Sequence, residues 1–401
     1  MEHPFQEAKP IIEKLHKHGF EAYFVGGAVR DYLIGRPIGD VDIATSAKPN
    51  EIQEIFSRTI DVGSEHGTII VLLQGNPFEV TTFRTESDYK DFRRPSNVQF
   101  ISSLKEDLKR RDFTINAIAM DQHGNIKDYF NGKEHIKQKL IQTVGNADDR
   151  FREDALRMLR AVRFVSQLSF TLDPNTKEAI VKNNELLKNI SVERKTIEFE
   201  KLLKGKSTNK AINLLVETKI YRHLPGLLNQ KENLINLSKL SFKHLCHQEE
   251  YWTLLAYILQ IKNVERFLRE WRLPVKLIRN VQTAIKHLSV IRSNGWNEKI
   301  LYELGLENAY KLERVRYAIQ KGERHEELLK KMYEKLPIKS RKELCVNGND
   351  LITMLNKKPG PWLSDTLSLL EDQILLGKLQ NEKQKIKEWL FTCNQKLEEN
   401  Y

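Results

Sequence analysis

A glycine pair and two aspartates one residue apart, set between two short strands, constrain this chain more than any other stretch. Residues 23–25 and 41–44 are short apolar or β-branched runs bounded by turn residues, a pattern that predicts strands. Because side chains alternate faces along a strand, we expect Asp40 and Asp42 to point the same way, close enough to share a cation. The glycines at 26–27 can turn sharply, and the helix expected after them begins with free N–H groups that can face a phosphate. The stretch is therefore suited to holding a nucleoside triphosphate and its metal ions.

Charge and composition indicate the class of partner. The 401 residues include 65 Lys and Arg against 54 Asp and Glu, a net charge of +11 that favours a polyanionic partner without separating RNA from DNA or membrane. Three widely spaced cysteines cannot form a disulfide framework, which fits a reducing cytosol. No apolar run approaches the roughly 20 residues that a membrane span needs, and the first ten residues lack the layout of a signal peptide. We therefore expect a soluble cytoplasmic protein without a membrane partner.

Two further strings place charged residues at set spacings. Arg111 and Asp112 lie in RRDFTINAIA, where the guanidinium can bind phosphate or ribose oxygens and the carboxylate can hold that guanidinium or accept from a 2′-OH. An adjacent Arg-Asp is otherwise an ordinary surface pair worth under about 1 kcal/mol. Residues 191–205 predict a helix on which Arg194 and Glu198 are spaced to pair.

Residues 151–165, FREDALRMLRAVRFV, predict one helix with an apolar side. On such a helix Asp154 and Arg157 are three residues apart and would be neighbours on one face. Arg160 and Arg163 continue at three-residue steps and form a slanting stripe. For an arbitrary helix, a salt-bridged face in solvent is the ordinary explanation of such a pattern.

Five ordered strings together resemble the class II tRNA nucleotidyltransferases, which include the bacterial CCA-adding enzymes, within the polymerase-β-like superfamily. They are GGAVRDYLIGRPIGDVDIAT, RRDFTINA, DYFNGKEHIKQKL, EDALRMLRAVRF and ERKTIEFEKLL. The resemblance implies an α/β nucleotidyltransferase head, a small mixed sheet with helices, followed by an all-α neck, body and tail in an elongated multi-domain chain. The implied domains are a catalytic head at 1–145, a neck for base recognition at 146–206, a helical body at 207–290 and a tRNA-binding tail at 291–401.

The resemblance also implies roles for individual residues. Asp40 and Asp42 would be catalytic and would hold Mg²⁺. Glu79, in a hairpin predicted from strands at 68–73 and 78–83, is the candidate third acid, with a solvated strand-face glutamate as the alternative. ATP and CTP would be bound by Gly27, Arg30, Arg111, Asp154, Arg157, Arg160 and Arg163.

Base selection follows from the chemistry of two of these residues. Cytosine and adenine both present an amino group beside a bare ring nitrogen. The carboxylate of Asp154 can accept from that amino group while the guanidinium of Arg157 donates to the ring nitrogen. Uracil and guanine reverse both positions and would leave buried polar groups unpaired. One pocket can thus admit CTP and ATP and reject UTP and GTP.

The implied reaction adds C, C and A to the 3′ end of tRNA from CTP and ATP and releases pyrophosphate. The polar segment 84–95 is expected to be an exposed loop, and a flexible loop at this position in the family argues against an enzyme that adds only CC. Three alternatives stay open: an A-adding tRNA nucleotidyltransferase, a poly(A) polymerase, and a catalytically inactive tRNA-binding protein. Homodimers occur in the family, although no residue here indicates one.

Overall fold

The protein was analysed as a computed structural model that describes residues 3–90 and 94–398. It divides into two compact units, which are described separately. The first comprises residues 1–242 together with 266–273, and the second comprises residues 243–265 together with 274–401. Within the described ranges, every helix is too short or too polar to cross a membrane.

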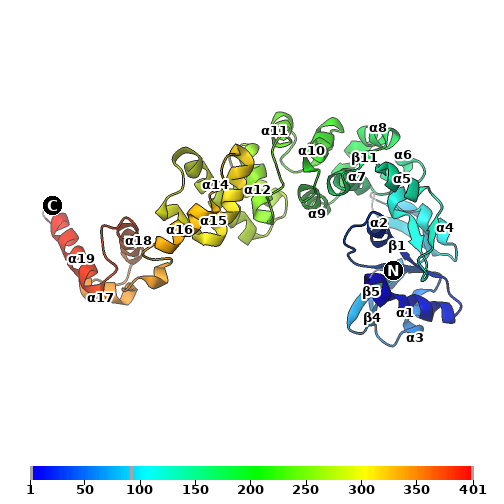
Figure 1. The fold of residues 1–401 in the computed structure, drawn as a ribbon, viewed down its shortest axis with the longest axis horizontal. Coiled ribbons are helices and arrows are strands. Elements are labelled where there is room, and N and C mark those ends of the chain that lie inside the picture. The colour runs from blue at the N-terminus through cyan, green and yellow to red at the C-terminus, as the bar shows by residue number, and fades with distance from the viewer. Residues whose placement is uncertain (1–2, 91–93, 399–401) are drawn as a thin grey trace. The chain divides into compact units, whose positions relative to one another are not determined.

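A seven-stranded mixed sheet lies in the N-terminal part of the first unit (Figure 1). Its spatial order is β3 (Thr59–Gly63), β4 (Thr68–Leu73), β5 (Asn76–Thr82), β2 (Asp42–Thr45), β1 (Ala22–Val25), β8 (Ile118–Met120) and β9 (Ile126–Asp128). β2 and β5 pair in parallel, whereas the other neighbours pair antiparallel. The strands predicted at 23–25 and 41–44 and the hairpin predicted from 68–73 and 78–83 are confirmed.

Three helices pack on this sheet through its main core. They are α1 (His3–Lys17), α2 (Gly27–Leu33) and α3 (Pro49–Ile55). In α1, apolar residues recur at helical spacing, so that Phe5, Ile12 and Leu15 are fully buried against the strands. Pro49 stands at the first turn of α3, where its missing N–H costs no hydrogen bond. The short helix α2 follows β1 directly and therefore carries its first residues to the edge of the site described below.

The segment predicted to be an exposed loop at 84–95 is instead a two-stranded ribbon, and that prediction is wrong. β6 (Arg84–Lys90) pairs antiparallel with β7 (Arg94–Phe100), with Arg84 opposite Phe100 and Lys90 opposite Arg94. Residues 91–93, which also belong to the predicted segment, lie outside the described residues. A high density of charged side chains indicates that a segment is exposed to solvent. Strand pairing, however, is made by hydrogen bonds between backbone groups, and charged residues supply these groups as well as apolar ones do.

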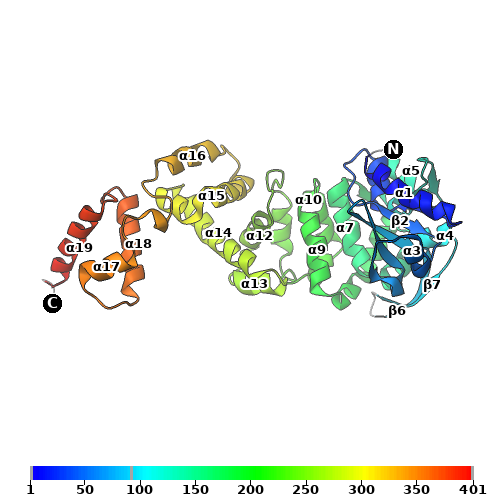
Figure 2. The same ribbon diagram turned by 90° about the horizontal axis from the view of Figure 1, so that it is seen from below.

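The remainder of the first unit is mostly helical. Its elements are α4 (Leu104–Lys109), η2 (Thr114–Asn116), α5 (Gly132–Gln138), β10 (Leu140–Ile141), α6 (Ala147–Glu153), α7 (Leu156–Leu168), β11 (Thr171–Leu172), α8 (Pro174–Asn183), η3 (Asn184–Asn189), α9 (Val192–Leu203), α10 (Thr208–Glu217), η4 (Ile220–His223) and α11 (Lys231–Leu237). Ser103 caps α4, since its hydroxyl accepts from the backbone N–H of Glu106. Helix α7 packs against α9 and α10, which lie beside it in Figure 2.

The single helix predicted at 151–165 is broken in two at Asp154. This residue has extended backbone angles, φ −138° and ψ 103°, and ends α6. Its carboxylate accepts from the backbone N–H of Leu156 at 3.1 Å, in the first turn of α7. An aspartate that hydrogen-bonds the backbone two residues ahead competes with helix continuation. Asp154 and Arg157 are therefore not neighbours on one helix face, and they meet through the turn between two helices.

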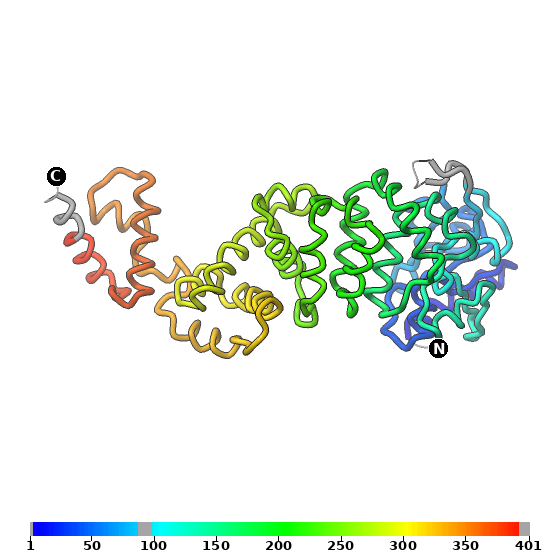
Figure 3. The backbone as a smooth tube through the Cα atoms, turned by 90° about the horizontal axis from the view of Figure 1, so that it is seen from above, coloured from blue at the N-terminus to red at the C-terminus, as the bar shows by residue number. Residues whose placement is uncertain are grey.

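From residue 243 onward, the described chain consists of helices and connections, as the tube in Figure 3 shows. The helices are α12 (Gln248–Ile258), α13 (Val264–Glu270), α14 (Val275–Asn294), α15 (Glu298–Gln320), α16 (Glu326–Lys335), η5 (Arg341–Glu343), α17 (Gly348–Leu355), α18 (Trp362–Leu375) and α19 (Lys383–Glu398). α15 is kinked at Gly305, whose φ of +70° lies outside the helical region. The mixed sheet followed by helices confirms the predicted fold class.

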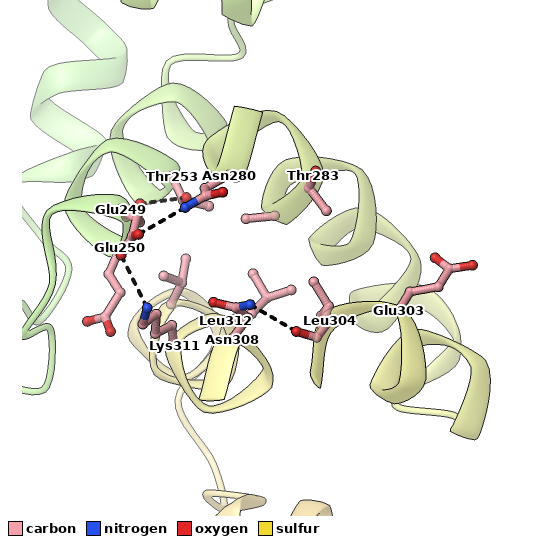
Figure 4. Close-up of a pocket in the computed structure, with 12 residues that line it drawn as sticks. Glu249, Glu250, Thr253, Asn280, Thr283, Glu303, Leu304, Asn308, Lys311 and Leu312 are labelled. Atoms are coloured by element: carbon pink, nitrogen blue, oxygen red, sulfur yellow. Dashed lines mark hydrogen bonds and ion pairs between the residues drawn. The ribbon is translucent and has the colours of Figure 1, made fainter. Parts of the chain in front are cut away.

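A cavity of about 230 Å³ lies among α12, α14 and α15 of the second unit (Figure 4). Glu249 on its wall pairs with Lys311 at 3.5 Å and accepts from Asn280 at 3.1 Å. Glu250 is 1% exposed and accepts from Arg314 Nε at 3.1 Å. Since these carboxylates are neutralised by protein partners, they serve helix packing.

Candidate active site

One pocket of the first unit collects most of the residues singled out in the sequence. We call it the arginine-rich pocket; its volume is about 740 Å³, and eight Arg and Lys side chains line it against five aspartates. This excess of cations suits a polyanionic ligand such as a triphosphate. The predicted residues that line it are Gly27, Arg30, Asp40, Asp42, Arg111, Asp154, Arg157, Arg160 and Arg163.

At Gly26 the backbone comes close to two charged side chains of this pocket. Its φ of +74° and ψ of −135° are accessible to glycine and strained for other residues. A Cβ built on it would lie 3.2 Å from Arg111 Nη1 and 3.5 Å from Asp42 Oδ2. β1 pairs with β2 so that Val25 stands opposite Asp42, which fixes this glycine beside the carboxylate. Gly26 is therefore favoured both by the backbone angles of the turn and by the space that the two side chains occupy.

The electrostatics of Asp42 fit a bound cation. Burial, the charge of Glu79 and the charge of Asp40 raise the pKa of Asp42 to about 6, against the opposing charge of Arg111. Two further carboxylates near a partly buried one repel it, and a bound divalent ion would offset this repulsion. Mg²⁺ and similar ions also prefer oxygen ligands, which carboxylates supply. Asp40 and Asp42 thus fit a metal ion on the chemistry of their donors.

Arg30 is anchored inside the pocket by its neighbours. It is 8% exposed, donates to Asn116 Oδ1 at 2.6 Å and pairs with Asp31 at 3.0 Å. Its guanidinium also lies over the ring of Phe164, 5.2 Å from the centroid. Burial lowers the pKa of Arg30, while the charge of Asp31 opposes that shift. The guanidinium is therefore held in one position, with its Nε and Nη2 donating to Asp31, and it adds a fixed positive charge to the pocket.

Asp112 pairs with Arg160 rather than with its sequence neighbour Arg111. Its Oδ2 accepts from Arg160 Nε at 2.8 Å and Nη2 at 2.6 Å. Burial would raise the pKa of Asp112, but the charge of Arg160 and the hydrogen bond from Asn116 outweigh it and hold the pKa well below its ordinary value. Arg111 pairs instead with Asp107 at 3.4 Å. The carboxylate of Asp112 therefore does not hold the guanidinium of Arg111, which was one of its two predicted roles.

Asp154 and Arg157 are each fixed by a partner but keep hydrogen-bonding capacity. Asp154 accepts from Arg194 at 2.8 Å through Oδ2 and at 3.3 Å through Oδ1, which also accepts from the N–H of Leu156. A carboxylate offers about four lone-pair sites, so Oδ2 retains one. Arg157 donates to Glu153 at 2.6 Å and to the carbonyl of Arg110 at 3.0 Å. A guanidinium has five N–H donors, and more than one remains.

The predicted pairing of Arg194 with Glu198 along α9 is wrong. Arg194 turns to Asp154, and Glu198 pairs with Arg163 at 2.6 Å and Arg160 at 3.8 Å. Burial lowers the pKa of Arg163 to about 10, with the charge of Glu198 opposing this. The pairing rule for residues four apart describes an isolated helix. Here α7 packs on α9 and offers partners across the interface, where burial strengthens the ion pairs.

Comparison with known proteins places this geometry in a family. Residues 22–142 match the family described as "Poly A polymerase head domain", residues 169–231 match "Probable RNA and SrmB- binding site of polymerase A", and residues 243–390 match "tRNA nucleotidyltransferase domain 2 putative". The chain is 50% identical over 398 residues to a CCA-adding enzyme of Geobacillus sp. (strain WCH70), covering 98% of each chain. It is also 50% identical to the CCA-adding enzyme of Bacillus subtilis (strain 168), over 98% of this chain and 100% of the relative. The chain belongs to the CCA-adding enzymes.

A solved structure agrees with this assignment. The chain resembles the crystal structure of the Bacillus stearothermophilus CCA-adding enzyme in complex with CTP, with a TM-score of 0.94, 47% identity and full coverage of both chains. The Thermotoga maritima CCA-adding enzyme complexed with tRNA is 22% identical with a TM-score of 0.66, which shows a shared fold. As a member of the CCA-adding enzymes, the chain is a tRNA nucleotidyltransferase.

Glu79, the candidate third acid of this CCA-adding enzyme, lies outside the arginine-rich pocket. It lines a second pocket of about 430 Å³ that also touches Asp40 and Asp42. Among the described residues, no three His, Cys, Asp or Glu side chains are close enough together to form a metal site. Glu79 therefore acts on Asp42 through its charge in this structure, and whether it binds a metal ion stays a prediction.

Two residues that contact Asp154 and Arg157 were not predicted to do so. Arg194 holds Asp154, and Glu153 holds Arg157. Glu153 stands four residues before Arg157, which is a spacing that favours an ion pair, so a local signal was present. Arg194 is 40 positions from Asp154. No local spacing indicates such a contact, which depends on the packing of α7 against α9.

Proposed function

We propose that this chain adds C, C and A in turn to the 3′ end of tRNA, using CTP and ATP and releasing pyrophosphate. The observation that carries this proposal is the continuity of the arginine-rich pocket, which joins the carboxylates of Asp40 and Asp42 to the pair of Asp154 and Arg157. One nucleoside triphosphate can thus meet both groups. Relatives about half identical over nearly the whole chain are named CCA-adding enzymes, and one such enzyme binds CTP, which supports the same conclusion.

In this proposal, Gly27, Arg30 and Arg111 bind the phosphates and the sugar. Their charges offset the negative charge that develops as pyrophosphate leaves. Arg111 is suited to this because it lines the pocket and its guanidinium is oriented by Asp107 at 3.4 Å. Arg160 and Arg163 are already paired with Asp112 and Glu198, and we assign them to support of the pocket wall.

Asp154 and Arg157 would select the base. The free lone pair on Asp154 Oδ2 accepts from the amino group of cytosine or adenine, and a free N–H of Arg157 donates to the adjacent ring nitrogen. Arg194 and Glu153 keep the two groups in place, so little ordering is needed on binding. Uracil and guanine would set acceptor against acceptor and donor against donor, at about 1–3 kcal/mol for each unpaired group.

Asp40 and Asp42 would hold Mg²⁺. When bound, these ions lower the pKa of the 3′-OH and stabilise the departing pyrophosphate. The carboxylates provide the oxygen ligands, and Gly26 leaves space beside them. Glu79 remains the candidate for a third acid. A cytoplasmic location belongs to this proposal, because bacterial tRNA is matured there.

A division of the chain by task also belongs to this proposal. Residues 1–145 would act as the catalytic head, residues 146–206 as the neck that reads the base, and residues 207–290 and 291–401 as the body and tail that hold tRNA. The excess of basic residues in the whole chain supports contact with the phosphates of tRNA.

The test is the length of the product. We would incubate the protein with tRNA that ends at the discriminator base, with CTP, ATP and Mg²⁺, and size the RNA on a sequencing gel. Extension by three nucleotides supports the proposal. Extension only of tRNA that already ends in CC would identify an A-adding enzyme, and a long A tail would identify a poly(A) polymerase. Asp42→Ala, with tRNA binding measured alongside, should abolish extension and leave binding nearly intact.

A further inference from the structure

Three arginines of the arginine-rich pocket gather around one aromatic ring. Phe164 lies on α7, lines the pocket and is 3% exposed. The guanidinium carbon of Arg163 lies 4.1 Å from the centroid of this ring, that of Arg30 5.2 Å and that of Arg160 5.7 Å. These distances are within the roughly 6 Å over which an aromatic ring attracts a cation. Phe164 is therefore a side chain that all three cations share.

The position of the ring is fixed by packing. Phe113 is fully buried, and its ring meets that of Phe164 at 84° with the centroids 5.6 Å apart, an edge-to-face arrangement that aromatic pairs favour. Arg160 and Arg163 belong to the same helix as Phe164, whereas Arg30 comes from α2, beside the sheet. The ring thus connects cations that lie far apart in the sequence.

The carboxylates near these arginines do not connect all three. The ion pairs join Arg30 to Asp31 at 3.0 Å, Arg160 to Asp112 at 2.6 Å and Arg163 to Glu198 at 2.6 Å. Glu198 also reaches Arg160 at 3.8 Å. Among the described residues, no carboxylate forms an ion pair both with Arg30 and with one of the other two arginines. The contact that links Arg30 to the arginines of α7 is therefore the one made through Phe164.

The three cations repel one another before an anion binds. Burial, together with the charges of Arg160 and Arg30, lowers the pKa of Arg163 to about 10, against the opposing charge of Glu198. Neighbouring cations thus destabilise the charged form of Arg163. The face of an aromatic ring carries the negative part of its quadrupole, and it attracts cations most strongly where water is excluded. The ring of Phe164 therefore offsets part of this repulsion.

We propose that Phe164 is a positioning residue for nucleotide binding, whose ring keeps Arg30, Arg160 and Arg163 gathered at the pocket before a triphosphate arrives. This inference rests on the proposed function, in which the nucleotide occupies this pocket. If the ring attracted cations less, the arginines of the free protein would move apart, whereas the phosphates of a bound nucleotide require them together. Binding would then have to gather them again, so the affinity for CTP and ATP would fall.

A fluorination series at this position tests the proposal. Fluorine withdraws electrons from the ring and weakens its attraction for cations, with little change in the size of the side chain. We would replace Phe164 with mono-, di- and trifluorinated phenylalanine at a suppressed stop codon, and with leucine in Phe164→Leu. The same fluorinated series at Phe151, which is fully buried on α6 and outside the pocket, is the matched control. Binding of CTP and ATP is measured by calorimetry, binding of cytidine by NMR, and stability by urea unfolding.

We expect the affinities for CTP and ATP to fall stepwise with the number of fluorine atoms, and by about tenfold or more in Phe164→Leu, the scale of cation–π contacts away from water. Cytidine has no phosphates, so its binding should not change along the series. The preference for CTP over UTP should also persist, because base reading is assigned to Asp154 and Arg157.

Equal CTP affinities across the fluorinated Phe164 proteins would overturn the assignment. So would losses of the same size in the Phe151 series or for cytidine, since these would indicate an effect on packing. The fluorinated proteins keep the test open if Phe164→Leu does not fold. If the wild type itself does not bind CTP, the proposed function has failed instead.

Discussion

Replacing Asp42 with asparagine tests whether the carboxylates at the start of β2 are crowded in the absence of a cation. Burial and the charges of Glu79 and Asp40 raise the pKa of Asp42 from 3.8 to about 6, although Arg111 opposes them. The folded, metal-free protein therefore holds this proton more tightly than the unfolded chain does. Below about pH 4 the carboxyl is protonated in both states and does not change the free energy of unfolding. As the pH rises to about 6, the free energy of unfolding falls because only the unfolded chain ionises freely, and above that pH the loss is constant. At about 1.4 kcal/mol per pKa unit, it amounts to at most about 3 kcal/mol at pH 8.

Asparagine removes this cost because it is neutral at every pH. We expect Asp42→Asn to be more stable than the wild type at pH 8 in EDTA, by up to about 3 kcal/mol, and the difference to shrink toward pH 4. Added Mg²⁺ should stabilise the wild type, since it binds the folded state, and should leave the variant unchanged. Urea unfolding followed by circular dichroism measures both effects, with Glu54→Gln, an exposed carboxylate of α3, as the control. A difference that does not vary with pH, or equal stabilisation of both proteins by Mg²⁺, would refute the reasoning.

Three other substitutions test separate parts of the site. Gly26→Ala should cost about 1–3 kcal/mol of stability, because alanine is strained at this φ and ψ, and should reduce CTP binding; unchanged binding would contradict the proposed close approach. Glu198→Gln should destabilise the protein by about 3 kcal/mol or more in urea, since it removes the countercharge of a buried Arg163, whereas the exposed Glu185→Gln should change stability by under about 1 kcal/mol. Asp154→Ala should allow UTP or GTP to compete with CTP in single-nucleotide extension, and retained selectivity would exclude the base-reading role.

Local structure could be predicted where neighbouring residues decide it. The strands around the glycine pair, the β4–β5 hairpin and the Ser103 cap each follow from hydrogen bonds or burial within a few positions of the chain. The β6–β7 ribbon did not follow in this way, because a dense run of charges gives no sign of which backbone groups will pair. The break at Asp154 was missed for a related reason: periodicity describes the apolar side of a helix and does not show that one carboxylate will cap the next helix.

The sequence by itself determined which chemical groups this CCA-adding enzyme has and the order in which they occur, and nine of the ten predicted site residues line one pocket. The tertiary structure decided how those groups are held: Asp112 by Arg160, Asp154 by Arg194 and Arg163 by Glu198. The physical reason is that a partly buried charged side chain pairs with the opposite charge that helix packing places beside it. For these side chains, the packing of α7 on α9 and on the head brings in residues some 35 to 48 positions away.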